Sequence, residues 1–277
     1  MLTELEFDEN HERDFELLIK AALEIGNSLD GQKTVIGRPS IYFAEGIGQK
    51  ILSHVISAHY VSKGYQLATN KHLFVEQIDF SSVSILVRAA LESYLTFNYV
   101  FVSEKDEDEL TFRFNCWNLG GFIDRSDFIP TEEKHVKLKD YESKQIKIIQ
   151  AELQKSDTFK SLNSENKKAA LNGRWKLSNS WSKLAVNAGF NKKFFDDQYK
   201  FLCSHAHSSR LSIIQIQQTK DLKSQSEMSK ASIGILMVVL AKYLFDYIRL
   251  IPELNHFTTD KEKYPMIAVW KQIGEEL

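Results

Sequence analysis

The sequence has few residues of the kinds that interrupt helices or crosslink chains. Its 277 residues include four Pro, twelve Gly and two Cys. So few helix breakers favour long helices over a sandwich of short strands joined by tight turns. Both cysteines, Cys116 and Cys203, lie in apolar helical patterns. We therefore expect two buried thiols in a reducing compartment, and no disulfide.

An excess of charge and long apolar runs are also lacking. The formal net charge of −2 gives the whole chain no strong attraction to nucleic acid or to acidic membranes. The longest apolar run, residues 233–241, is far shorter than the roughly 20 residues that a spanning helix needs, and we interpret it as part of a buried core helix. The acidic residues at the N-terminus resemble neither a signal peptide nor a transit peptide. We expect a soluble, cytoplasmic protein without a membrane partner.

Motifs of several common enzyme and metal-site classes are missing too. The sequence contains no GxxxxGK[ST], GxGxxG, HExxH, CxxC or GxSxG. His205 and His207 form an HxH pair, but residues two apart on a helix point about 200° away from each other and cannot share a metal ion. We therefore expect neither a metal site nor a cofactor.

The sequence does contain apolar residues at helical spacing over most of its length. This periodicity predicts an all-α multi-helix bundle that forms a single domain, residues 1–277. Core helices are expected near residues 9–29, 39–63, 80–102, 192–207 and 226–250. The polar, lysine-rich residues at about 131–171 predict a protruding helical insertion that binds a protein partner, or alternatively a plain solvated surface helix. A C-terminal tail, residues 252–277, can add one short amphipathic helix.

The segments between these helices carry weaker patterns. Residues 64–80 are mixed and are compatible with a short strand or a turn. The acidic residues 104–109 predict a cap for the helix that follows them. We expect that helix to end near Gly120 and Gly121, because glycine favours helix ends.

One pair of charged residues stands inside an apolar helical pattern. Arg88 and Glu92 are four residues apart in ILVRAALESYL, so they share one helix face. Burial of such a pair is costly unless both groups have partners. A structural ion pair and a polar pocket among the helices both remain open.

A second helix, near residues 192–207, also combines polar and apolar residues on one side. Tyr199 and His207 are eight residues apart and lie near one line along a helix. We expect His207 to face the core or a pocket within it. A core histidine with satisfied hydrogen bonds is the alternative. We predict that Arg88, Glu92, Tyr199 and His207 come close in space.

Together these segments resemble an uncharacterised bacterial all-helical family. Its pattern is an Arg-x-x-x-Glu helix, a Trp segment and a Tyr-x-x-Leu-Ser-x-x-x-His helix. The corresponding residues here are Arg88 and Glu92, then Trp181, then Tyr199, Leu202 and His207. Cys203 stands where the family has Ser, which puts any role of that hydroxyl in doubt. The resemblance covers roughly residues 40–250.

The Arg–Glu helix and the later His helix are also distantly reminiscent of HEPN-like proteins, some of which are ribonucleases and toxins of antiviral systems. This resemblance implies a metal-independent ribonuclease of a bacterial defence or stress system that acts on RNA, as a homo-oligomer. Arg88, Glu92, Tyr199 and His207 would then be its catalytic residues. The alternative is a non-catalytic interaction or oligomerisation module in which the Arg–Glu–His cluster is structural. A small-ligand sensor with a pocket in the core is a third interpretation.

Overall fold

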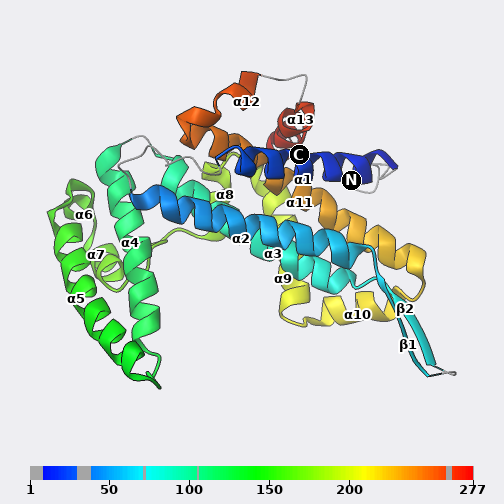
Figure 1. The fold of residues 1–277 in the computed structure, drawn as a ribbon, viewed down its shortest axis with the longest axis horizontal. Helices are drawn as coiled ribbons and strands as arrows, with labels where there is room; N and C mark the ends of the chain where they lie inside the picture. The colour runs from blue at the N-terminus through cyan, green and yellow to red at the C-terminus, as the bar shows by residue number, and fades with distance from the viewer. Residues whose placement is uncertain (1–8, 30–38, 71–72, 105, 260–263, 277) are drawn as a thin grey trace. The chain divides into compact units, whose positions relative to one another are not determined.

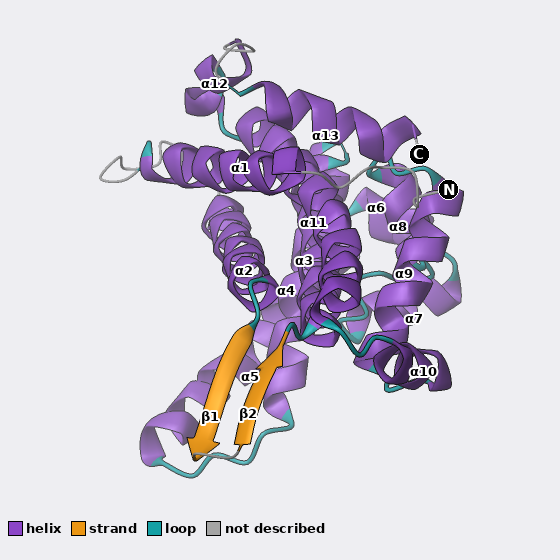
Figure 2. Cartoon of the chain, turned by 90° about the vertical axis from the view of Figure 1, so that its right-hand side faces the viewer, coloured by secondary structure: helices purple, strands orange, loops and turns teal. Residues whose placement is uncertain are grey.

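The computed structural model describes residues 9–29, 39–70, 73–104, 106–259 and 264–276 (Figure 1). The described chain is helical apart from one two-stranded hairpin (Figure 2), so the predicted all-α class is confirmed. The chain divides into two compact units. Unit 1 comprises residues Met1–Phe97 and Ala185–Leu277, and unit 2 comprises residues Asn98–Leu184. That the chain forms a single domain stays a prediction.

Unit 1 contains the segments predicted as core helices, except residues 98–102 of the predicted helix 80–102, together with the hairpin and the C-terminal helices. Its elements are α1 (Glu9–Asn27), α2 (Pro39–Ser62), β1 (Tyr65–Asn70), β2 (Leu73–Gln77), α3 (Phe80–Phe97), α9 (Lys192–Ala206), α10 (Arg210–Gln218), α11 (Leu222–Leu250), a 3-10 turn η3 (Pro252–Leu254), α12 (His256–Thr259) and α13 (Pro265–Glu276). The strands pair antiparallel, with Leu67 opposite Val75, in the segment predicted as strand or turn.

Helix α3 packs against α2, α9 and α11 in unit 1. Figure 1 shows α2 and α3 running side by side. The buried residues Val83, Val87, Leu91 and Tyr94 recur every three or four positions along α3, which is the spacing of a face turned toward a core. Because α3 and α9 are neighbours, the predicted packing of these two helices is confirmed.

The apolar run at residues 233–241 lies within α11 and is buried, as predicted for a core helix. By length and composition alone, two described helical stretches, Phe80–Val102 and Leu222–Leu250, are long and apolar enough to cross a membrane. In their most apolar windows, 61% and 83% of the residues are buried inside the protein. Core helices of globular proteins meet the same criteria, so this is weak evidence for a membrane span.

Helix α13 docks on α11 through its last turns. Gly274 lies so close to Val238 that an added Cβ would collide with the valine side chain. The buried Lys242 places its Nζ 3.3 Å from Glu275 Oε1 and 3.3 Å from the carbonyl oxygen of Gly189. The C-terminal residues of α13 thus provide both close backbone packing and a partner for a buried charge.

Unit 2 has its own hydrophobic core. Its elements are a π-helix η2 (Asn98–Val102), α4 (Glu107–Ser126), α5 (Glu133–Lys155), α6 (Asp157–Ser161), α7 (Ser164–Leu171) and the start of α8 (Trp181–Asn187), which crosses the boundary to unit 1. Cys116 and Leu119 of α4 pack with Ile149 and Leu153 of α5. The segment expected as a polar insertion therefore supplies one wall of this core.

Helix α4 begins as predicted but ends later than predicted. Asp106 caps it by accepting hydrogen bonds from the backbone amides of Asp108 and Glu109. The predicted end near Gly120 is wrong, because the helix continues to Ser126. A Cβ at Gly120 would lie 2.6 Å from the carbonyl oxygen of Gly173. Gly120 therefore permits a close backbone contact and does not terminate the helix.

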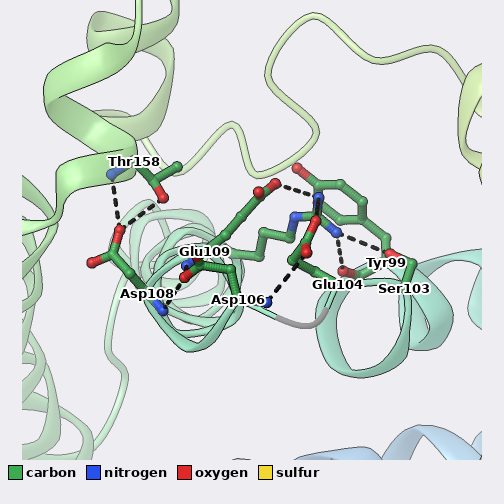
Figure 3. A network of polar contacts seen from close by, with 8 residues as sticks. Tyr99, Ser103, Glu104, Asp106, Asp108, Glu109 and Thr158 are labelled. Carbon is green, nitrogen blue, oxygen red and sulfur yellow. Dashed lines mark hydrogen bonds and ion pairs between the residues drawn. The ribbon is translucent and has the colours of Figure 1, made fainter.

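Polar contacts at the start of α4 connect this helix to other segments of unit 2 (Figure 3). The Asp108 carboxylate accepts 2.8 Å hydrogen bonds from the amide and the hydroxyl of Thr158, and these lower the pKa of Asp108. The Arg113 guanidinium donates to the Tyr99 carbonyl oxygen at 3.2 Å and pairs with Glu109. Both groups fix segments of unit 2, and we assign them a structural role.

Candidate functional site

The four residues predicted to meet do meet, within unit 1. Arg88 Nε donates to Glu92 Oε1 at 2.9 Å across one turn of α3. The Tyr199 hydroxyl, on α9, donates to the same Glu92 oxygen at 2.6 Å. Arg88 Nη1 lies 3.0 Å from Nε2 of His207. We call these four residues the Arg–His cluster.

Aromatic contacts hold the cluster in place. The Tyr199 ring stacks on Phe195, one turn earlier in α9, with ring centroids 5.2 Å apart and planes inclined by 13°. The Arg88 guanidinium carbon lies 5.6 Å from the centroid of the Tyr199 ring. Phe195 was not predicted as a site residue, although its position four residues before Tyr199 already places it on the same face.

The cluster is open to solvent at one end. The side chains of Arg88 and Glu92 are 20% and 28% exposed, and His207 is exposed. The expectation that His207 faces the core is wrong. Helix α9 ends at Ala206, and His207 is its C-cap, with its backbone amide bonded to the Cys203 carbonyl oxygen.

The local backbone explains why His207 leaves the core. Ser208 adopts a positive φ of 49°, a left-handed conformation that stops α9 and turns the chain. Ser209 then caps α10 by accepting from the Ser212 amide. The core histidine is His205, which is 4% exposed and packs edge-on against Phe80. Burial lowers the pKa of His205, so its imidazole is neutral near pH 7.

Electrostatic interactions fix the protonation states of Arg88 and Tyr199 in the cluster. Burial works against the charged guanidinium, but the Glu92 carboxylate outweighs it and raises the pKa of Arg88. Burial, together with the hydrogen bond to Glu92, raises the pKa of Tyr199 well above its usual value near 10. At neutral pH the cluster therefore holds a permanent cation and a protonated phenol.

The contact between Arg88 and His207 also constrains the imidazole. Arginine has only donors, so Nε2 of His207 must accept and its ring proton must sit on Nδ1. A neutral imidazole in this tautomer leaves Nδ1 as a donor on an exposed ring. The arrangement places an exposed imidazole beside a fixed cation.

Neither thiol has a disulfide partner, and no metal cluster accompanies the site. Cys116 is buried, which raises its pKa to about 12, whereas Cys203 is only half-buried. Cys203 lies one turn after Tyr199 on α9. In the part of the chain that the structure describes, no group of three or more His, Cys, Asp or Glu side chains could hold a metal ion.

Comparison with known proteins supplies a family but no reaction. No curated protein and no solved structure matches the chain. The likeness to HEPN-like proteins therefore stays an expectation. A model of a family of unknown function, DUF5677, matches residues 54–224, a range that includes every residue of the Arg–His cluster. Because this match covers more than half of the sequence, the chain belongs to the DUF5677 family.

Proposed function

We propose that the Arg–His cluster is the active site of a metal-independent ribonuclease. The observation that carries this proposal is the 3.0 Å contact between Arg88 Nη1 and Nε2 of the exposed His207. A sealed cluster would favour a purely structural role. A cation held beside a solvent-exposed imidazole suits a phosphodiester, which needs charge stabilisation and proton transfer.

The proposed reaction is an internal transesterification of RNA. In the proposed step the Nη1 hydrogen of Arg88 turns from His207 to a phosphoryl oxygen, and the freed Nε2 of His207 accepts the proton of a ribose 2′-hydroxyl as the 2′ oxygen bonds to the adjacent phosphorus. The bond from phosphorus to the 5′ oxygen breaks, and the imidazolium returns its proton to that leaving oxygen. The products are a 2′,3′-cyclic phosphate and a 5′-hydroxyl, and no oxidant, reductant or metal ion is consumed.

Arg88 stabilises the charge that builds up on the phosphoryl oxygens during this step. Its Nε stays bonded to Glu92, which leaves the other guanidinium N–H groups for the substrate once Nη1 turns away from His207. Glu92 and Tyr199 are positioning residues, since Glu92 orients the guanidinium and Tyr199 fixes Glu92. The proposed role in a bacterial defence or stress system, as a homo-oligomer, depends on this activity.

The test is cleavage of a fluorescently labelled single-stranded RNA in the presence of EDTA. We expect His207→Ala to reduce cleavage at least about 100-fold, which is the usual contribution of a general acid–base group. The matched control is His135→Ala, because His135 is also exposed but lies on α5 of unit 2. Cleavage without a cyclic phosphate product, equal cleavage by wild type and His207→Ala, or no cleavage by wild type would reject the proposal.

A second candidate is a non-catalytic interaction module in which the cluster braces α3 against α9. It is favoured by the mutual pairing of Arg88 and Glu92, which requires no ligand. In this case the segment at about 131–171 would bind a partner protein, and the exposed Tyr141 is one side chain there that could contact it. His207→Ala would then lower stability without changing partner binding, which differs from the ribonuclease outcome.

A further inference from the structure

A cavity lies elsewhere in unit 1, between α1, α2 and α11. These three helices can be followed in Figures 1 and 2. The cavity has a volume of about 450 Å³. This is within the range of sites that hold small organic molecules, roughly 300–1,000 Å³. None of the four residues of the Arg–His cluster lines it.

Each helix presents one face to the cavity. On α11 the lining residues Ser226, Ser229, Lys230 and Ile233 follow the spacing of a single helix face. Helix α2 contributes His59, Ser62 and Lys63, and α1 contributes His11, Glu12 and Phe15. The walls thus combine hydroxyls, imidazoles, ammonium groups and one carboxylate with two buried apolar side chains.

Polar and apolar groups are separated within the cavity. Phe15 and Ile233 are 2% and 9% exposed, and the Phe15 ring lies 5.6 Å from the His59 ring between centroids. These groups form an apolar surface on which a ring or a chain of carbons can rest. Ser226 and Lys230 stand on the preceding turns of α11, so a polar end and an apolar end are defined.

Ser229 carries the observation that points to a ligand. The residue is 2% exposed and lines the cavity, and its Oγ has no hydrogen-bond partner among the described residues. A buried hydroxyl without a partner costs free energy. A ligand oxygen in the cavity would satisfy it. Packing of α11 does not require a hydroxyl at this position, because an alanine would occupy the same space.

The charges around the cavity favour an anion. Lys63 forms ion pairs with Glu12 and, at 3.9 Å, with Glu16, which does not line the cavity. Lys230 is exposed and lies beside Ser226 and Ser229, so two ammonium groups and one carboxylate line the cavity. Burial, and then the nearby Lys63, lowers the pKa of His59, so its neutral imidazole can donate or accept a hydrogen bond.

We infer that this cavity binds a small organic anion that joins a carboxylate or phosphate group to an apolar ring or chain. The anionic group contacts Lys230, Ser226 and Ser229, and the apolar part packs against Phe15 and Ile233. This binding activity does not depend on the proposed ribonuclease. It gives the chain a second site, on helices other than α9.

The experiment uses three naphthalene probes that share one apolar part, with titration calorimetry on the full chain. 1-Naphthyl phosphate and 1-naphthoate carry the two anionic groups, and 1-naphthol is neutral near pH 7. We expect at least one anion to bind about tenfold more tightly than 1-naphthol. Binding by only one anion identifies the head group. Failure of both anions to bind, or equal binding of 1-naphthol, overturns the inference.

Variants locate the binding site. Lys230→Glu should weaken binding of the anion at least about tenfold, whereas the control Lys223→Glu, at an exposed position on the same helix outside the cavity, should not. Ser229→Ala should weaken binding about threefold and raise the melting temperature of the free protein, because it removes a buried hydroxyl that has no partner within the described protein. Equal affinities for Lys230→Glu and Lys223→Glu would place the probe elsewhere and overturn the inference.

Discussion

The hydrogen bond from Tyr199 to Glu92 joins α9 to α3 in the Arg–His cluster, and Tyr199→Phe removes this hydrogen bond alone. The hydroxyl and Oε1 are 2.6 Å apart, a short distance that is typical of a bond to a charged acceptor. Such bonds contribute about 1.5–3 kcal/mol when buried. Since Glu92 is 28% exposed, we expect a loss near the lower limit, about 1.5 kcal/mol in the free energy of unfolding.

Urea unfolding followed by circular dichroism measures this loss. For a chain of this size, about 1.5 kcal/mol corresponds to a fall in Tm of roughly 3–6 °C. The control Tyr141→Phe removes a hydroxyl from a residue that is 56% exposed on α5, and it should leave stability unchanged. The charge also matters, so Glu92→Gln should destabilise the protein as well.

A double-mutant cycle isolates the contact from other effects of each substitution. Tyr199→Phe and Glu92→Gln should show a coupling free energy of about 1 kcal/mol. The reasoning is refuted if the two losses add to within about 0.3 kcal/mol, which is the behaviour of independent sites. It is also refuted if Tyr199→Phe is as stable as the Tyr141→Phe control.

Two further predictions concern packing and pH. Gly120→Ala should destabilise the protein by about 2 kcal/mol in urea unfolding, because its Cβ would collide with Gly173. The control Gly121→Ala has open space around its Cβ and should be neutral or stabilising by up to about 1 kcal/mol. Equal effects of the two substitutions would contradict the close contact between Gly120 and Gly173. Burial raises the pKa of Tyr199 and Tyr243 above 10. Their stabilising contribution is therefore complete below about pH 10 and is lost as the pH rises beyond it. The free energy of unfolding should fall less between pH 8 and pH 11 for Tyr199→Phe than for the wild type. An equal fall would show that Tyr199 does not contribute to the pH dependence of stability.

Local spacing was sufficient to predict most of the Arg–His cluster. Arg88 and Glu92 share a face of α3 because they are four residues apart, and an Arg–Glu pair in an apolar helix needs a partner such as Tyr199. The orientation of His207 could not be predicted in the same way. It depends on where α9 ends: the helix stops at Ala206, one residue before the predicted end, and Ser208 just beyond it is left-handed. Helix ends are set by local hydrogen bonds, which the periodicity of apolar residues does not report.

Contacts between segments that are distant along the chain could not be predicted from the sequence. Gly120 carries the signal of a helix end, yet the structure uses it for an approach to Gly173, which is more than fifty residues away. The residues that line the cavity between α1, α2 and α11 form no recognisable sequence motif either. His59 and Ser229 look like ordinary helix residues until the fold brings their helices together.

The docking of α13 has a consequence for how the gene can be shortened. Translation that stopped before codon 274 would remove both Gly274 and Glu275, and the surface of α11 that they cover would be exposed at Val238. The ammonium group of Lys242 would also lose the Glu275 carboxylate, which lies 3.3 Å away. Loss of this last turn of α13 should therefore act as a destabilising mutation in the centre of unit 1.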